Sequence, residues 1–282
     1  MEELNNKLDK ITFDENAEHD VSKDPIYAAK DHDSQFDPKQ YLEGFYKTAK
    51  EDTAMQVILF FLPGVLYRLP EKVENLLDLG AGPTVYIPIA VRKRAENIFT
   101  SDYAEANRQT LKSWIESKSE FDWTNVCTWL SNIEATNESP KMMQELARSK
   151  MRGILSVNVH KDTVIQEVYY QHTEYKKEIP KQFDVVTTVF CLEYASETLE
   201  EYQNAVKNAT SLIKNGGFLI QGGVLNADEY SFGGRRFRCH HLTKEQLLNC
   251  LKQNNMSIDE KESCFKLIIH DDIFILVSKK YM

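Results

Sequence analysis

The sequence has little cysteine, and the cysteines that it has form no pattern. Five are present among 282 residues, an odd number, widely spaced and without a C-x-x-C pair. Such spacing predicts neither a disulfide framework nor a zinc site. We therefore expect reduced thiols and no bound metal. The five residues are Cys127, Cys191, Cys239, Cys250 and Cys264.

Long hydrophobic runs and blocks of basic residues are also missing. The longest apolar stretch, residues 57–67, is broken by Pro63 and Gly64 and is too short to cross a bilayer. The first residues lack the basic head and apolar centre of a secretory signal. The formal net charge is −9, and no cluster of Lys and Arg could hold a phosphate backbone. We expect a cytoplasmic protein, monomeric, with a small-molecule partner and neither nucleic-acid nor membrane partners.

Short β-rich runs alternate with helical stretches through most of the chain. The runs are residues 75–81, 97–103, 154–159, 183–190 and 217–224. This alternation is typical of a parallel sheet with helices on both faces. Two further apolar runs flank Asp271 and Asp272, which predicts a C-terminal antiparallel hairpin, and Gly233 and Gly234 predict a second hairpin. The expected fold is a Rossmann-like α/β sheet of seven mostly parallel strands.

Changes in polarity suggest how the chain is organised. Residues 1–35 are polar and acidic, and we expect them to form an arm, whereas residues 36–282 should form one domain. Within that domain, residues 36–70 should form a helical lid. Residues 118–153 should form an insertion, because a structureless loop of that length is unusual.

The sequence LLDLGAGPTVY, residues 76–86, follows the first predicted strand. In an open α/β sheet, the loop at this point lines the ligand crevice. Gly80 and Gly82 let the main chain approach a ligand, and Thr84 can cap the next helix. Asp102 ends the next predicted strand, and its distance in sequence from Gly82 suits a carboxylate that binds both hydroxyls of a ribose.

Two cofactor classes use such a loop. A dinucleotide fingerprint requires a third glycine where the pyrophosphate binds, and this chain has Val85 there. The loop therefore favours S-adenosylmethionine, which has one nucleoside and an amino-acid tail, over a nicotinamide dinucleotide.

Several blocks of the sequence resemble the small-molecule amine methyltransferases, a family that includes nicotinamide, phenylethanolamine, indolethylamine and thioether methyltransferases. The blocks are FDPKQYLEGFY (36–46), DLGAGPTVY (78–86), SDY (101–103) with Asn107, FDW (121–123), FCLE (190–193) and KNGGFL (214–219). The resemblance runs from about residue 36 to the C-terminus. It implies a class I methyltransferase fold with a helical lid, S-adenosylmethionine as the cofactor, and N-methylation of a small amine or pyridine such as nicotinamide.

The resemblance also implies which residues bind the cofactor. They are Tyr41, Tyr46, Gly80, Gly82, Thr84, Tyr86, Asp102, Tyr103, Asn107, Asn158, Val159 and Val189. Asn158 replaces an aspartate of the relatives, but its side-chain carbonyl can accept the same hydrogen bond. For Tyr41 and Tyr46, spacing alone favours packing in an aromatic core, and only the resemblance favours the cofactor.

The substrate side of the site is less defined. The resemblance implies that Glu193 is catalytic, because it could orient the substrate amine or take its proton; a solvated loop carboxylate is the alternative. The expected substrate-binding residues are Tyr41, Glu193, Tyr230, Cys239 and His270, although an exposed hairpin position is equally expected for His270. Acids that the nicotinamide and phenylethanolamine enzymes carry are replaced by Gly223 and Ala227. The sequence therefore does not identify the preferred amine. It also leaves open the alternative of a catalytically silent protein that binds S-adenosylmethionine.

Overall fold

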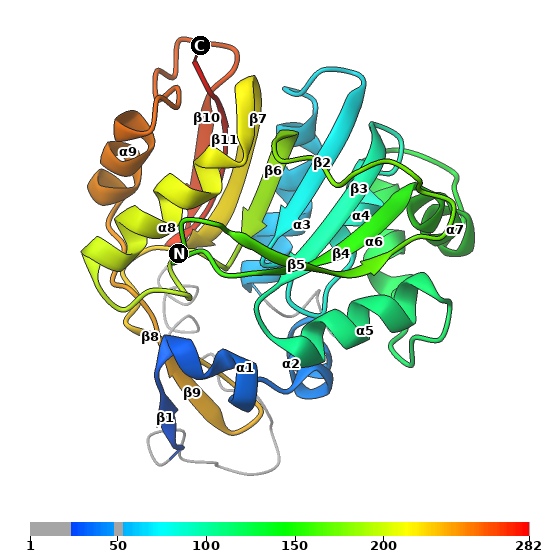
Figure 1. Cartoon of the computed structure of the whole chain (residues 1–282), viewed down its shortest axis with the longest axis horizontal. Helices are drawn as coiled ribbons and strands as arrows, with labels where there is room; N and C mark the ends of the chain where they lie inside the picture. The colour runs from blue at the N-terminus through cyan, green and yellow to red at the C-terminus, as the bar shows by residue number, and fades with distance from the viewer. Residues whose placement is uncertain (1–23, 48–52, 282) are drawn as a thin grey trace, which may run out of the picture.

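One large sheet with helices on both sides forms the centre of the computed structural model, which describes residues 24–47 and 53–281 (Figure 1). The strands are β2 (Val73–Leu79), β3 (Ala95–Asp102), β4 (Met151–Val157), β5 (Ile165–Gln171), β6 (Phe183–Val189), β7 (Ile213–Val224), β10 (Lys266–His270) and β11 (Ile273–Lys279). Their order is β10-β11-β7-β6-β2-β3-β4-β5. Neighbours from β7 to β4 are parallel, and β11 reverses direction. The Rossmann-like architecture is therefore confirmed.

Helices cover both faces of this sheet because its strands are apolar on both sides. The helices are α3 (Thr53–Leu66), α4 (Tyr86–Val91), α5 (Glu105–Ile115), α6 (Thr124–Ile133), α7 (Pro140–Lys150), α8 (Leu199–Ser211) and α9 (Lys244–Gln253). Leu76 and Leu77 on β2 belong to different apolar layers, since successive side chains of a strand point to opposite faces. One layer holds residues of α3 to α7, and the other holds residues of α8 and α9.

The sheet has one strand more than the seven expected. Strand β5 pairs antiparallel with β4 at the edge of the sheet. Its side chains are mostly exposed or half-buried, so no hydrophobic run marks it in the sequence. An edge strand can be stabilised largely by backbone hydrogen bonds to its neighbour, which is why the apolar pattern did not reveal it.

Both predicted hairpins are confirmed. Strands β10 and β11 are joined through Asp271 and Asp272, with φ of 47° and 61°. Strands β8 (Glu229–Phe232) and β9 (Arg235–Arg238) are joined through Gly233 and Gly234, with φ of 54° and 69°. Positive φ at both central residues is what a two-residue hairpin turn requires.

The described N-terminal residues pack on the second hairpin. Part of the expected arm, residues 1–23, lies outside the described residues. From residue 24 onward the chain forms β1 (Ile26–Tyr27), the 3₁₀ turn η2 (Ala29–Asp31), α1 (His32–Gln35) and α2 (Pro38–Phe45). Strand β1 pairs in parallel with β9, so residues 24–35 belong to the folded body of the protein instead of a free arm. Asp37 caps α2 by accepting hydrogen bonds from two backbone N–H groups of its first turn.

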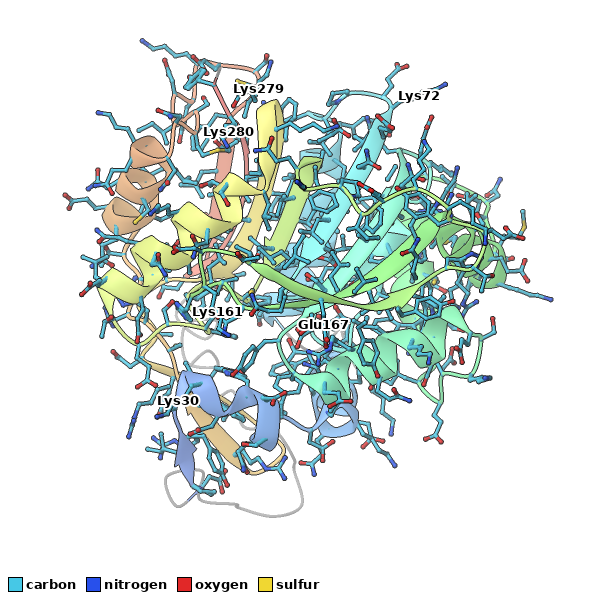
Figure 2. The ribbon with its side chains drawn as sticks, viewed as in Figure 1. Lys30, Lys72, Lys161, Glu167, Lys279 and Lys280 are labelled. Carbon is cyan, nitrogen blue, oxygen red and sulfur yellow. The ribbon has the colours of Figure 1, made fainter. Side chains whose placement is uncertain are left out.

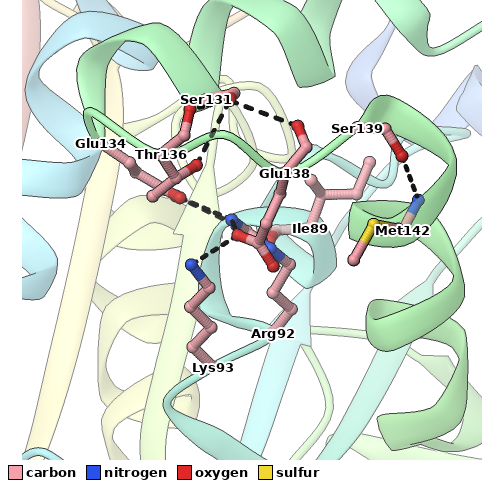
Figure 3. A network of polar contacts seen from close by, with 9 residues as sticks. All are labelled: Ile89, Arg92, Lys93, Ser131, Glu134, Thr136, Glu138, Ser139 and Met142. Atoms are coloured by element: carbon pink, nitrogen blue, oxygen red, sulfur yellow. Dashed lines mark hydrogen bonds and ion pairs between the residues drawn. The ribbon is translucent and has the colours of Figure 1, made fainter.

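A buried ion cluster joins α4 to the range expected as an insertion, where α6 and α7 lie. Arg92 is fully buried and donates to both carboxylate oxygens of Glu134, at 3.0 and 2.6 Å, and to Glu138 at 2.5 Å. Figure 3 shows this cluster, with Lys93 also paired with Glu138. Burial alone would lower the pKa of Arg92, but the two glutamates raise it. The cation is therefore neutralised where it is buried.

Candidate functional site

A cavity of about 230 Å³ lies where the parallel strands end. Asp102 ends β3, and Val189 ends β6; both line the cavity. Lys30, another lining residue, lies with Lys161 at this end of the sheet, whereas Lys72, which precedes β2, lies at the opposite end (Figure 2). The structure brings these predicted residues together around the cavity: Tyr41, Tyr46, Gly80, Gly82, Thr84, Tyr86, Asp102, Tyr103, Asn107, Asn158, Val159, Val189 and Tyr230.

The glycine loop and Asp102 form one hydrogen-bonded unit. The N–H of Gly82 donates to Asp102 Oδ2 at 2.8 Å, and Ala104 N and Asn107 Nδ2 donate to Oδ1 at 2.9 and 3.0 Å. Burial raises the pKa of Asp102, although these three hydrogen bonds lower it in part. Because each carboxylate oxygen can accept two hydrogen bonds, Asp102 is held in place and Oδ2 still has one lone pair for a ligand.

The two glycines of the loop are required for different reasons. At Gly80, with φ of 69°, an added Cβ would lie 2.1 Å from Cys191 Sγ. At Gly82, with φ of 60°, the nearest atom outside its chain neighbours, Cγ2 of Thr84, would be 4.0 Å away, so only the backbone conformation calls for glycine. The bare main chain at Gly80 therefore serves packing against the loop after β6.

Two tyrosines in and just after α2 belong to an aromatic cluster and also line the cavity. Tyr46 is buried, and its ring stacks on Tyr86 with centroids 5.7 Å apart. Tyr41 lies 6.0 Å from Tyr46 and packs edge-on against Phe232 of β8 at 5.2 Å. Tyr41 and Tyr46 therefore both pack among aromatic side chains and line the cavity, so the two interpretations do not exclude each other.

Buried carboxyls next to the cavity have no cationic partner among the residues that the structure describes. Asp78 is buried below the glycine loop, and burial raises its pKa to about 7; Thr187 donates a hydrogen bond to Oδ1 at 2.8 Å. Its Oδ2 atom, like Oδ1 of Asn107 and Oε2 of Glu193, is buried without a hydrogen-bond partner among the described residues. Within the described ranges, Asp78, Asp102 and Glu193 form no ion pair. This end of the sheet is suited to a ligand that brings positive charge.

Glu193 is next to the site but does not line the cavity. Its side chain is fully buried, and Oε1 accepts a hydrogen bond from Val224 N at 3.2 Å. A Cβ at Gly223 would lie 2.2 Å from the same oxygen, so Glu193 fills the space that a side chain at position 223 would need. Burial raises the pKa of Glu193 to about 8. The alternative of a solvated loop carboxylate is wrong.

Cys239 and His270 also lie away from the cavity lining. Cys239 is buried, and its thiol donates to the carbonyl oxygen of Ala227 at 3.4 Å. The side chain of His270 is 61% exposed beside Asp271, because His270 is the last residue of β10 before the hairpin turn. The expectation that His270 contacts the substrate is therefore wrong, and the alternative of an exposed residue beside the hairpin turn is the one observed.

Residues of the N-terminal segment that were not expected from the sequence also line the cavity. His32 and Lys30 line the cavity, together with Phe190 and Tyr194 from the loop after β6. The segment is attached by Ala29 N, which donates to Glu197 Oε1 at 2.9 Å. Polar residues without periodicity gave no signal for this placement, which depends on pairing between β1 and β9.

The chain is similar to known proteins over most of its length. The model of the NNMT/PNMT/TEMT family matches residues 24–281. The chain belongs to this family. A Caenorhabditis elegans nicotinamide N-methyltransferase is 57% identical over 95% of this chain and 97% of its own length. The human nicotinamide N-methyltransferase is 27% identical, with 88% and 94% of the two chains covered.

A solved structure of another methyltransferase has a similar fold. Magnesium protoporphyrin IX methyltransferase from Synechocystis, solved with bound S-adenosylmethionine, has a TM-score of 0.52 at 12% identity, covering 89% of this chain and 94% of that one. The family and the methyltransferase fold predicted from the sequence are therefore confirmed, and this chain is an S-adenosylmethionine-dependent N-methyltransferase. The family match begins at residue 24, so it includes part of the segment expected as a separate arm. Among the described residues, no helix is long and apolar enough to span a membrane.

Proposed function

We propose that the protein transfers a methyl group from S-adenosylmethionine to the nitrogen of nicotinamide or of a closely related small pyridine or amine. The observation that carries this proposal is a cavity beside a glycine loop, next to buried carboxyls that form no ion pair in the described residues. The choice of substrate is supported by the name of the worm relative, a nicotinamide N-methyltransferase at 57% identity.

The residues around the cavity fit this cofactor. Asp102 keeps one lone pair, on Oδ2, for a ribose hydroxyl, and Asn107 Oδ1, buried and without a partner among the described residues, can accept a further hydrogen bond. Asn158 Oδ1 accepts one bond from His160 N at 2.9 Å, which leaves a lone pair for the adenine amino group. Asp78 supplies negative charge to balance the positive groups of the cofactor.

The protein's part in the reaction is to position the reactants and exclude water. When bound, the cofactor supplies a methyl group on a positively charged sulfur, and the nitrogen lone pair of the substrate attacks in line with the bond that breaks. Tyr41 of α2 and Tyr46, which directly follows α2, close over the reactants. Phe190, Tyr194 and Tyr230 form aromatic walls for the substrate. A closed, dry site favours methyl transfer to the substrate over reaction with water.

Glu193 is the proposed acid-base residue for amine substrates. With a pKa near 8, its carboxyl matches an amine that must lose a proton near neutral pH, directly or through a water molecule. A pyridine nitrogen has no proton to lose, so for nicotinamide the same side chain would only help to position the ring.

A product screen tests the proposed function. The protein is incubated with S-adenosylmethionine and, separately, nicotinamide, quinoline, tryptamine and phenylethanolamine, and products are identified by mass spectrometry. We expect an N-methylated product, strongest with nicotinamide. Cofactor binding without any methylated product would favour a silent binding protein, and micromolar binding of NAD alone in isothermal titration would contradict the assignment of the cofactor.

We further propose that the protein acts as a monomer in the cytoplasm, without nucleic acid. The acidic net charge of −9 supports the last point. Light scattering after size-exclusion chromatography tests the monomeric state, and a dimer mass would overturn it.

A further inference from the structure

His32 occupies a place in the cavity wall that links the N-terminal segment to the substrate side. It is the first residue of α1, and its ring stacks on Phe237 of β9 with centroids 4.8 Å apart at 16°. Its Nδ1 atom is hydrogen-bonded to the carbonyl oxygen of Ala29, and its Nε2 atom to the hydroxyl of Tyr230. Both His32 and Tyr230 line the cavity.

These two hydrogen bonds determine which nitrogen of His32 carries the proton. A carbonyl oxygen can only accept, so Nδ1 must donate to Ala29. In a neutral imidazole the other nitrogen is then an acceptor, and the hydroxyl of Tyr230 must donate to Nε2. With its hydrogen committed to His32, the Tyr230 oxygen can offer only lone pairs to a ligand in the cavity.

Stacking on neighbouring aromatic rings fixes the position of the Tyr230 ring and of its hydroxyl. It stacks on Tyr194 with centroids 3.9 Å apart and planes within 2°, and on Phe237 at 5.4 Å. The hydroxyl therefore has a defined place between His32 and the cavity.

We propose that His32 is a positioning residue that makes the Tyr230 hydroxyl a hydrogen-bond acceptor, so that the substrate site selects small heteroaromatic rings bearing an N–H donor. This inference rests on the proposed methyl transfer and names the substrate feature that the site reads. A primary carboxamide on a pyridine ring has such a donor, whereas a ketone in the same place has only an acceptor. Tyr230 would touch the substrate, and His32 would act through Tyr230.

The charges around His32 agree with a neutral ring near pH 7. Burial lowers the pKa of His32, while the hydrogen bond to Ala29 and the carboxylates Asp102 of β3 and Asp31 of η2 raise it in part, and the balance is a lowered pKa. Below that pKa, Nε2 would gain a proton and donate to the Tyr230 oxygen. The tyrosine hydrogen would then turn toward the cavity, and the site would favour an acceptor on the substrate.

A matched pair of substrates tests this proposal. Nicotinamide and 3-acetylpyridine have similar shape and the same ring nitrogen, and they differ in an NH₂ donor that is replaced by a methyl group. The measured quantity is the ratio of their kcat/KM values for methyl transfer, in the full chain. The variants are Tyr230→Phe, which keeps the stacked ring; His32→Phe, which keeps the stack on Phe237; and His32→Gln, whose side-chain oxygen can replace Nε2 as the acceptor.

We expect Tyr230→Phe and His32→Phe each to lower the nicotinamide preference about tenfold, mainly through a higher KM for nicotinamide, as loss of one hydrogen bond would. His32→Gln should retain the preference within about threefold. In the wild type, the ratio should fall once the pH is lowered below the depressed pKa of His32, and in His32→Gln it should stay constant over the same range.

The outcomes separate this inference from the proposed function. If the wild type methylates both pyridines and the variants change both kcat/KM values equally, the role of His32 is overturned while N-methyl transfer stands. A preference that is independent of pH and of His32 would overturn it as well. If the wild type binds S-adenosylmethionine but methylates neither pyridine nor any amine of the product screen, the proposed function itself fails.

Discussion

Two groups of buried ionisable side chains differ in whether they are paired with an opposite charge. At Arg92, a fully buried cation is surrounded by Glu134 and Glu138, and each terminal nitrogen of its guanidinium donates to a carboxylate (Figure 3). Beside the cavity, Asp78 and Glu193 are equally buried, but neither forms an ion pair in the described chain, and each has an oxygen without a hydrogen-bond partner.

The difference separates a structural role from a binding role. A buried charge is costly unless it is paired, so a cluster that neutralises itself joins helices and needs no ligand. Carboxyls left without a cation carry raised pKa values, about 7 for Asp78 and about 8 for Glu193. Ionisable groups with strongly shifted pKa values are common at functional sites. A positively charged cofactor would supply the cation that these carboxyls lack within the described chain.

Among single substitutions, removal of the structural cation should have the largest effect. Arg92→Met leaves two carboxylates without their buried partner, and we expect the free energy of unfolding to fall by about 3–5 kcal/mol. Urea denaturation measures it. The dissociation constant for S-adenosylmethionine should remain within about threefold of the wild-type value; a large loss of affinity in folded protein would mean that the two groups of charge are not independent.

On the binding side, Asp102→Ala should weaken cofactor affinity by about 100-fold or more. The ribose hydroxyls would lose a charged acceptor, and the N–H of Gly82 and the amide of Asn107 would lose their partner. Glu193→Gln should mainly lower kcat for amine substrates and change affinity by less than about threefold. Isothermal titration and initial rates separate the two effects, and equal losses of affinity would contradict the assigned roles.

The stability of the free protein should fall as the pH rises from about 5 to about 8. Both carboxyls are ionised in the unfolded chain in this window, whereas in the folded protein each stays protonated up to the pKa that burial gives it, about 7 for Asp78 and about 8 for Glu193. The folded state therefore binds more protons, and each group contributes a slope of about 1.4 kcal/mol per pH unit until its folded pKa is passed. Thermal unfolding across this range measures the slope. The double variant Asp78→Asn, Glu193→Gln should lose most of it, and an unchanged slope would show that other groups cause it.

The smallest effect is expected at the rim of the Arg92 cluster. Lys93 pairs with Glu138, but its side chain is 49% exposed. Lys93→Met should cost less than about 1 kcal/mol, since exposed ion pairs contribute little. Urea denaturation beside Arg92→Met makes the comparison, and a cost as large as that of Arg92→Met would assign the stabilisation to net charge instead of burial.

The parts of the site that lie on strand ends could be predicted from the sequence. A run of apolar residues, a glycine turn and the next strand's Asp102 have a spacing that a parallel sheet converts into proximity. The hairpins at Asp271 and at Gly233 were equally readable, because their turn chemistry is local. Strand β5 was not, since an exposed edge strand needs no hydrophobic run.

Contacts between distant segments could not be read in the same way. His32 contacts Tyr230, 198 positions away, only because β1 pairs with β9. The buried position of Glu193, in the loop after β6, depends on the missing side chain at Gly223 of β7. Neither relation leaves a periodic or spacing signal in the chain.

By itself, the sequence determined the alternation of strands and helices, the glycine loop and the carboxylate that faces it, because backbone preferences and hydrophobic periodicity act over a few residues. The tertiary structure alone decided which buried acids form no ion pair within the described chain, which segment closes the cavity and which way the Tyr230 hydroxyl donates. Those properties depend on burial and on hydrogen-bond partners that come together only when the sheet and its N-terminal segment are assembled.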